Sequence, residues 1–590
     1  MSEGIQEEIM KKVFSLFVAF TFLAGLSVQA VAAGVPDEQY VLELPAHDPS
    51  TIPTYGISAN GLGEFPTNIN YLLGKKSDGN QIGVSKVTAV GLCTSMADAA
   101  CVGASVLHYK AQLGLCTNSL TNDCISEITV KKEDGSNLDF TTSTFPDSTS
   151  GAFSGDANLG LPSGDQTPLI TIPALPHEGG NQYLVVVSAD SYKLPNNSKF
   201  EPANIKSAIY AVKIEQKYNS LPGVQTSMNW YDKLDLSLGA WTNPTTACPI
   251  YSANQCAQPY PLPLNVKFGF KLKISNPVKG WLHGRMDGIT SDVTLDANGN
   301  QTISIQGNPI VVPSTYGWTK KSEAAKTVAD FYDKMKKPIG GNGFGCTNDP
   351  NGGRATNGCS NEYWVSFLRH LRADQESMDE FLAWLPALQD KASKAPTIWR
   401  WETMGTDGSN DSCYRNTSNL SGFVSTNATQ YLSGPPVFNK SEESLDYKVA
   451  APHYLPNGKE FLGSYNLIIS GEVARCLYRF TDAPIQASVS VTSSDGQARV
   501  ATTSLVERDG WLKLSANGFT FSNPTVKVKL SQEKVVPVPT PTPSASTTPS
   551  PAASTKPAAA KRISITCVKG KTNKKITAVN PKCPTGFKKK

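Results

Sequence analysis

The sequence predicts a mainly β protein, with antiparallel β-sandwich domains, an inserted small helical lobe and disulfide staples. Three observations predict this fold. Short apolar runs alternate with turn residues along most of the chain, which is typical of all-β domains. Twelve cysteines fall into close neighbours, which indicates disulfides. The chain has 590 residues with 47 Gly and 40 Pro, so it is too long for one ordinary domain and too turn-rich for a helix bundle.

The N-terminal region, residues 1–33, has the pattern of a secretory signal. Lys11 and Lys12 precede an apolar run from Val13 to Val28, and small residues follow at Ala30-Val31-Ala32. Met10, directly before the lysines, is the expected start. An uncleaved membrane anchor is the alternative, but the run is short for a span. The pattern predicts a secreted or cell-surface protein with no transmembrane helix in the mature chain.

Residues 34–240 are predicted to form an N-terminal all-β domain. Apolar runs at 183–188 and 208–214 are typical of strands. Within this domain, Gly91-Leu-Cys93-Thr is echoed 23 residues later by Gly114-Leu-Cys116-Thr, and each copy has a second cysteine eight positions on. The echo predicts a duplicated, disulfide-closed hairpin; a pair of ligand-binding loops is the sharper alternative.

Residues 241–535 are predicted to form a second β-sandwich domain. Residues 264–274 alternate strictly between apolar and polar side chains, and residues 293–305 form a hairpin around Asp296-Ala-Asn-Gly299. Later strands are predicted to pack against them in one sandwich. These later strands are 465–470, 485–492, 499–505 and 525–530.

A helical lobe, residues 319–400, is predicted inside this second domain. Apolar residues step by three and four from Ser322 until Pro338 stops the pattern. A second helix is expected at residues 362–372, and a third begins near Ser377.

All twelve cysteines lie beyond the signal region. The predicted pairs are Cys93 with Cys101, Cys116 with Cys124, Cys248 with Cys256, Cys346 with Cys359, Cys413 with Cys476, and Cys567 with Cys583. A nested arrangement of the first four, Cys93 with Cys124 and Cys101 with Cys116, is the alternative. No C-x-x-C pair and no histidine at ligand spacing supports zinc, so no metal site is predicted.

Charge divides the chain into an acidic body and a basic tail. Residues 34–535 carry a net charge of −6, whereas residues 536–590 carry eleven Lys or Arg and no acid. Residues 536–560 alternate Pro with Ser, Thr, Ala and Val, which is typical of a semi-rigid spacer.

Residues 561–590 form a basic tail, with two short strands expected around a turn near Asn573 and a staple between Cys567 and Cys583. The tail resembles a short Cys-paired, Lys-rich C-terminal module found after Pro/Ser/Thr linkers on exported proteins of actinobacteria. That resemblance covers about 30 residues and implies an envelope context without catalysis. Ten Lys or Arg predict attraction to an anionic envelope polymer or glycan. A solubilising tail without a ligand is the alternative, and nucleic acid is not expected.

No common catalytic or cofactor motif is present. The chain has no G-x-S-x-G elbow, H-E-x-x-H pair, Walker loop or G-x-G-x-x-G turn after a strand. No cofactor is therefore predicted, and an enzyme is not favoured. The histidine with the most suggestive neighbours is His283, which Arg285 and Asp287 follow. These residues could hold an anionic group; a packed Trp281 with a surface ion pair is the alternative.

Tryptophans around the helical lobe are the second candidate ligand surface. Four of the nine tryptophans, Trp364, Trp384, Trp399 and Trp401, lie there, with Glu402 beside the last. Exposed indoles stack on sugar rings, and a neighbouring carboxylate supplies hydrogen bonds or acid chemistry. Packing of these tryptophans in a core explains the same residues.

Three functions remain as hypotheses. The first is an exported, cell-envelope-associated or secreted protein for surface binding or adhesion. The second is a secreted hydrolase acting on polysaccharide, with carboxylates such as Glu402 as catalytic candidates. The third is a structural component of a surface layer.

Overall fold

The computed structural model divides the chain into two compact units, Met1–Glu533 and Lys534–Lys590. We call them unit 1 and unit 2 and describe each by itself. The residues that the structure describes are 54–59, 70–77, 87–145, 152–216, 251–252, 255–335, 369–370, 373–404, 411–415, 420–481, 485–492, 498–499, 502–508, 510–521, 525–532, 563–569, 572–578, 582–584 and 587–589. The predicted signal, residues 1–33, lies outside them.

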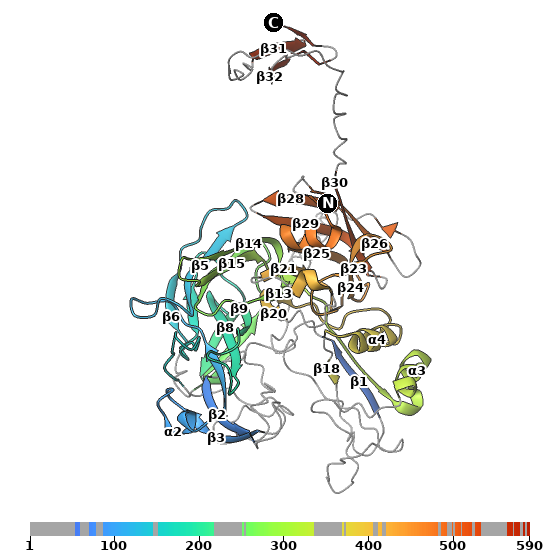
Figure 1. Ribbon diagram of the computed structural model, residues 1–590. Helices are drawn as coiled ribbons and strands as arrows, with labels where there is room; N and C mark the ends of the chain where they lie inside the picture. The colour runs from blue at the N-terminus through green and yellow to red at the C-terminus, as the bar shows by residue number, and fades with distance from the viewer. Residues whose placement is uncertain are drawn as a thin grey trace, which may run out of the picture. The chain divides into compact units, whose positions relative to one another are not determined.

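Unit 1 contains a main sheet of 15 strands among the described residues (Figure 1). Neighbours along it are antiparallel, except that β13 and β21 run parallel. In spatial order the strands are β28 (Thr502–Arg508), β29 (Trp511–Thr520), β25 (Leu462–Ser470), β21 (Leu420–Thr426), β13 (Gly280–Arg285), β20 (Arg400–Met404), β9 (Asn204–Gln216), β8 (Gln182–Lys193), β4 (Val106–Gln112), β2 (Tyr71–Ser77) and β3 (Val87–Cys93). Side strands are β11 (Gln255–Tyr260) and β10 (Tyr251–Ser252) beyond β9, and β7 (Pro168–Thr171) and β6 (Thr141–Thr144) beyond β8.

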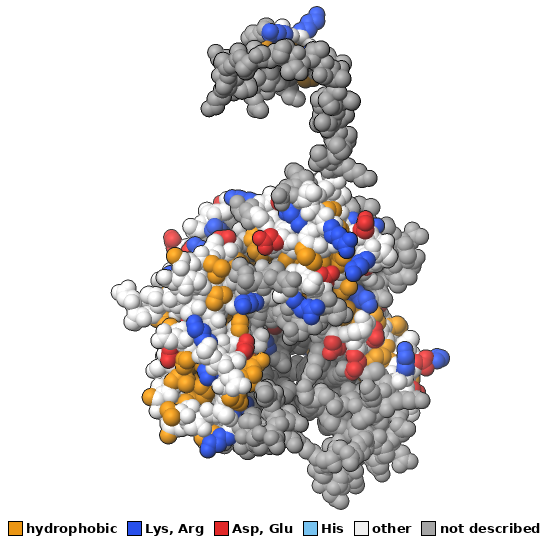
Figure 2. All heavy atoms as spheres, in the orientation of Figure 1, with side chains coloured by type: hydrophobic (Ala, Val, Ile, Leu, Met, Phe, Trp, Pro, Cys, Tyr) orange, Lys and Arg blue, Asp and Glu red, His pale blue; other side chains and the backbone are white. Residues whose placement is uncertain are grey.

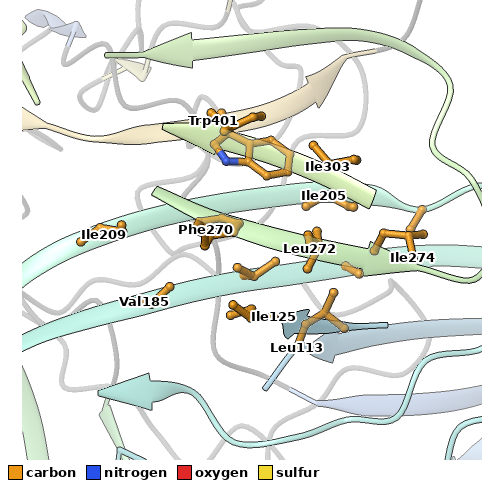
Figure 3. Close-up of a cluster of buried hydrophobic side chains, with 14 of the residues drawn as sticks. Leu113, Ile125, Val185, Ile205, Ile209, Phe270, Leu272, Ile274, Ile303 and Trp401 are labelled. Atoms are coloured by element: carbon orange, nitrogen blue, oxygen red, sulfur yellow. The ribbon is translucent and has the colours of Figure 1, made fainter. Parts of the chain in front are cut away.

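A four-stranded sheet packs against the main sheet and closes the first hydrophobic core. Its order is β14 (Asp287–Leu295), β15 (Gln301–Asn308), β12 (Val266–Ile274) and β5 (Cys124–Lys132). The predicted alternation is confirmed in β12, where Phe270 and Leu272 are buried and Lys273 is exposed. These apolar side chains meet Val185 and Ile209 of the main sheet in the core (Figure 3). The predicted hairpin is β14–β15.

A six-stranded sheet covers another part of the main sheet and encloses the second core. Its strands are β22 (Gln430–Tyr431), β24 (Ser444–Ala450), β30 (Thr525–Gln532), β26 (Ile485–Thr492) and β27 (Ala498–Arg499), with β23 (Val437–Asn439) beside β24. Tyr447, Val449 and Val528 from this sheet pack with Leu467 and Leu514 of the main sheet. The predicted mainly β, antiparallel sandwich fold is thus confirmed.

Helices are few and short in the described residues. They are α2 (Ala99–Val102), the 3-10 turn η3 (Lys321–Glu323), α3 (Lys326–Met335), α4 (Gln375–Trp384), α5 (Ser412–Arg415) and α6 (Gly471–Tyr478). Asp374 caps α4 by accepting a hydrogen bond from the Ser377 backbone N–H at 2.8 Å. In the part of the chain that the structure describes, no helix has both the length and the apolar character needed to span a membrane.

The helical lobe is smaller than its predicted range, 319–400. α3 and α4 pack together around Val328, Phe381 and Trp384, beside β1 (Thr54–Ala59) and β17 (Thr315–Lys320). The helix expected at 362–372 is corrected in part, because β18 (Arg369–His370) pairs in parallel with β1. Residues 362–368 lie outside the described residues. Two short strands, β16 (Ile310–Val311) and β19 (Thr397–Ile398), also pair.

Four predicted disulfides are present. They are Cys93–Cys101, Cys116–Cys124, Cys413–Cys476 and Cys567–Cys583, so the nested arrangement is excluded. The remaining predicted pairs include Cys248, Cys346 and Cys359, which lie outside the described residues. The two echoed loops differ in structure: the first contains α2, and the second a turn in which Thr117 N–H donates to the Leu120 carbonyl.

The predicted boundary near residue 240 does not separate two sheets. β8 and β9, from the range 34–240, lie in the same main sheet as β13 and β20, from the range 241–535. β5 likewise joins the four-stranded sheet of β12. The physical reason is that strand pairing joins segments far apart along the chain, which local sequence patterns do not reveal.

Unit 2 contains a three-stranded sheet. Its order is β32 (Thr572–Ala578), β31 (Ile563–Lys569) and β33 (Lys588–Lys589). Cys567 is fully buried and bonds to Cys583, and Ile565 is buried nearby on the same strand. A sheet this small has little core of its own, so the disulfide supplies much of its stability.

Candidate functional site

The pairing of β13 with β20 brings together two segments that the sequence separates by more than a hundred residues. His283 lies opposite Glu402, and Arg285 lies opposite Arg400. Directly paired residues of neighbouring strands project from the same face of a sheet. Two separately predicted candidates, the His283 segment and the exit of the helical lobe, therefore form one group of side chains.

Tyr431 of β22 completes this group, which we call the buried polar cluster: His283, Arg285, Arg400, Glu402 and Tyr431. Its ring stacks on the His283 ring, with 3.6 Å between centroids and 5° between planes. The guanidinium carbon of Arg285 lies 4.6 Å from the centroid of the same ring. The Tyr431 hydroxyl lies 3.5 Å from Glu402 Oε1.

Both arginines of the cluster are buried and hydrogen-bonded. Arg400 Nη2 lies 2.8 Å from Glu402 Oε2. The Arg285 guanidinium donates to three backbone carbonyls, those of Thr426 at 2.9 Å, Ala428, and Thr429 at 3.4 Å. Arg285 is 1% exposed, so these carbonyls replace the water that would otherwise surround its charge.

Burial and neighbouring charges set the protonation states. Burial lowers the pKa of His283 well below its usual value, and Arg285 and Arg400 lower it further. Burial also lowers the pKa of Arg285 to about 10, which still leaves it charged at neutral pH. For Arg400, burial acts to lower the pKa, but Glu402 and nearby tyrosines outweigh it and raise the pKa above the ordinary value. The cluster thus holds a neutral histidine beside two guanidinium ions.

The chemistry that this cluster offers is hydrogen bonding and packing of polar groups inside the fold. Its five residues include one carboxylate, Glu402, and Arg400 engages that carboxylate. Glycoside hydrolysis uses two carboxylates across a cleft. The cluster therefore lends no support to the hydrolase hypothesis. It also corrects the expectation of a surface ion pair at this segment, because Arg285 and His283 are both buried.

The tryptophans that the structure describes do not form an exposed ligand surface. Trp384, Trp399 and Trp401 are buried, and Trp364 lies outside the described residues. Trp399 Nε1 donates to the Gly307 carbonyl at 2.9 Å. Trp401 packs near Phe270, with 5.8 Å between ring centroids, in the core under the four-stranded sheet (Figure 3). Core packing, the alternative interpretation of these residues, accounts for all three.

Unit 2 presents the second candidate site, a basic surface. Lys582, Lys588 and Lys589 are exposed, and blue side chains mark this end of the chain in Figure 2. Residues 561–590 contain ten Lys or Arg and no acid. A small sheet with this composition carries a strong positive potential, which attracts anionic polymers.

Sequence reasoning missed a contact between Asp390 and His453. His453 Nδ1 contacts Asp390 Oδ2, and the His453 backbone N–H donates to Asp390 Oδ1 at 3.0 Å. Asp390 and the preceding Gln389 both have positive φ, 53° and 56°. Nothing in the sequence links Asp390 with His453, because they lie far apart along the chain. The contribution of Tyr431 to the buried polar cluster was missed for the same reason.

No family model matches the chain, and no curated protein sequence matches it. The resemblance of residues 561–590 to an actinobacterial tail module therefore stays a prediction.

Proposed function

We propose that this chain is an exported protein that binds at a cell envelope, with unit 2 as its electrostatic contact to an anionic polymer. The observation that carries the proposal is the charge and construction of unit 2. It is a disulfide-closed sheet with exposed Lys582, Lys588 and Lys589, and residues 536–590 contain no acid.

The charge of the rest of the chain supports this division of roles. Residues 34–535 carry a net charge of −6, so an anionic surface repels them on average. Attraction between exposed charges extends over about 10 Å at 0.1 M salt. Contact with a polyanion is therefore expected through unit 2 rather than through unit 1.

Export is supported by two features. Residues 11–32 have the order of a secretory signal, and four disulfides are consistent with folding in an oxidising compartment. Binding is preferred to hydrolysis because Arg400 engages the one carboxylate of the buried polar cluster, Glu402. The role that we propose for unit 1 is adhesion or recognition at the surface that unit 2 contacts.

The test is co-sedimentation of the full chain with beads that carry polyphosphate and, separately, beads that carry alginate. We expect binding that falls steeply as salt rises from about 0.05 M to about 0.5 M, because salt screens exposed charges. The triple variant Lys582→Gln, Lys588→Gln and Lys589→Gln is expected to bind at least about fivefold more weakly, since loss of each contact costs a few tenths of a kcal/mol or more.

The matched control removes three exposed lysines from unit 1, with Lys132→Gln, Lys273→Gln and Lys279→Gln. It changes the net charge equally and is expected to bind like the unaltered chain. Equal weakening of both triple variants would mean that net charge alone drives binding, and the proposal would be wrong. Binding that salt leaves unchanged would contradict it as well.

A further inference from the structure

The buried polar cluster is the place where two sheets of unit 1 are joined by polar groups. His283, Arg285, Arg400 and Glu402 belong to the main sheet, and Tyr431 belongs to β22 of the six-stranded sheet. Arg285 also bonds to the carbonyls of residues 426–429, the segment that leads from β21 into β22. Displacement of β22 from β13 therefore requires the His283–Tyr431 stack to part.

No described group is placed to accept a hydrogen bond from His283 Nε2 if the ring is protonated. The residue is 2% exposed, and no described atom forms a hydrogen bond with Nε2. Arg400 already engages Glu402, which lies directly opposite His283 in the β13–β20 register. Two other charged residues project from the same face of the main sheet, Arg285 on β13 and Lys206 on β9. Three tyrosines lie close to the arginines: Tyr431 on β22, Tyr447 on β24 and Tyr210 on β9.

A charged imidazole would therefore meet mainly like charge. The described charges closest to it are two cations, Arg285 and Arg400, and one carboxylate, Glu402, while Lys206 lies on β9, beyond β20. The Tyr431 ring also lies against the Arg285 guanidinium, so protonation of His283 would place two cations against one ring. Separation of β22 from β13 is the movement that lets water reach a protonated ring.

We propose that His283 is an acid sensor in this joint: protonation of its ring releases Tyr431 and loosens β22 and β24 from the main sheet. Burial and the two arginines keep the pKa of the folded ring well below 6.5, so the folded joint binds fewer protons than the opened one. The contact between His283 and Tyr431 therefore makes its full contribution to holding β22 against β13 above about pH 6.5. Below it, the equilibrium constant for closure falls by up to about tenfold per pH unit, until the folded pKa is reached.

The experiment is hydrogen exchange of the full, disulfide-intact chain from about pH 7.5 to about pH 5, with rates corrected for the intrinsic pH dependence of exchange. We expect protection of peptides that cover residues 430–431 and 444–450 to fall by about tenfold per pH unit below about pH 6.5. Protection of the β12–β15 pair is expected to stay constant. His283→Gln, which cannot take up the proton, is expected to abolish the fall at β22 and β24.

The matched control is His108→Gln, which removes another neutral histidine, on β4, away from the joint. It is expected to keep the acid loss at β22 and β24. The proposal is wrong if His283→Gln retains that loss, or if β12–β15 loses protection in parallel with β22, which would indicate global unfolding.

A second measurement covers the case in which His283→Gln does not fold. Imidazole resonances of the unaltered chain, labelled at its six histidines, are followed over the same pH range. We expect the His283 ring to stay neutral in molecules whose β22 amides remain protected. A ring that titrates near its ordinary pKa, about 6.5, while β22 stays protected would overturn the proposal.

Discussion

Arg285 shows at the residue scale how this chain keeps a charge inside its fold. Three backbone carbonyls, of Thr426, Ala428 and Thr429, receive its N–H groups, and the Tyr431 ring faces its guanidinium. Backbone oxygens cannot move away without disturbing β21 and β22. The arginine therefore fixes the path of the chain between two sheets.

Arg285→Gln is expected to lower the free energy of unfolding of unit 1 by about 3 kcal/mol. Several buried carbonyls lose their donor, and each costs about 1–3 kcal/mol when left unsatisfied, with partial relief from the shorter amide. Chemical denaturation of the full chain measures the change. Lys273→Gln, at an exposed position of β12, is the control and is expected to change it by less than about 0.5 kcal/mol. Equal effects of the two substitutions would contradict the role given to Arg285.

Sequence analysis identified three of the five members of the buried polar cluster, but not their burial. His283, Arg285 and Glu402 stood out because ionisable residues cluster beside tryptophans in two short segments. Their burial and their meeting depend on strand register, since His283 faces Glu402 only when β13 and β20 pair as they do. The same pattern of tryptophans in the sequence is expected for a sugar-binding surface and for a hydrophobic core. Only the four-stranded sheet that covers Trp399 and Trp401 shows that they belong to a core.

At the scale of elements, disulfides tie short helices to the rest of the fold. Cys413 of α5 bonds to Cys476 of α6 across 63 residues, whereas Cys93 of β3 bonds to Cys101 of α2 across only 8. Closing a longer loop removes more entropy from the unfolded chain. The two disulfides are therefore expected to differ in their contribution to stability.

Replacing Cys413 and Cys476 by Ser is expected to lower the free energy of unfolding by about 4 kcal/mol, from the loop-entropy relation. The matched double substitution of Cys93 and Cys101 is expected to cost about 2.5 kcal/mol by the same relation. Denaturant titration of both variants under non-reducing conditions checks the order. A larger loss at the shorter loop would show that packing of the cystine, rather than loop length, sets the contribution.

Local patterns predicted the elements whose stability is local. The alternation of β12, the β14–β15 hairpin and the start of α4 are confirmed, because each depends on neighbours in sequence. The helix expected at 362–372 is wrong at Arg369 and His370, where pairing with β1 provides backbone hydrogen bonds that a helical period does not foretell. Distant pairing thus overrides local preference at this point.

For the whole molecule, unit 2 is expected to contribute nothing to the stability of unit 1. A chain that ends at Glu533 keeps every described strand of the six-stranded sheet, since β30 ends at Gln532. Its thermal midpoint is expected to match that of unit 1 in the full chain within about 1 °C, which is roughly the shift that a change of 1 kcal/mol produces in a unit of this length. Differential scanning calorimetry makes the comparison.

A chain that ends at Pro524 is the control for this truncation. It lacks β30, which pairs with both β24 and β26. We expect it to lose the cooperative transition of unit 1. A large drop in midpoint for the chain ending at Glu533 would show that the two units stabilise each other.

The overall class and the separate basic end follow from composition and charge, but the organisation of residues 34–535 does not. Those residues have the pattern of two consecutive β domains because each half has its own strands and turns. The structure joins them, because β9 of the first range pairs with β20 of the second in the main sheet, and β1 lies between β17 and β18 in the small sheet. The pairing and register of strands that lie so far apart in sequence depend on which apolar faces pack together. A single sequence does not show which faces these are.

This pairing of β9 with later segments also governs the order in which the chain can fold. One edge of β9 pairs with β8, but its other described partners are β11 and β20, so that second edge stays open until residues 255–260 and 400–404 have been delivered. Pairing between segments that are distant in sequence is slow. Until it is complete, the unpaired edge of a strand can form hydrogen bonds with a strand of another chain. Synthesis from the N-terminus therefore leaves a long interval in which aggregation competes with completion of the main sheet. A chaperone that shields β8 and β9 during that interval would raise the yield of folded protein.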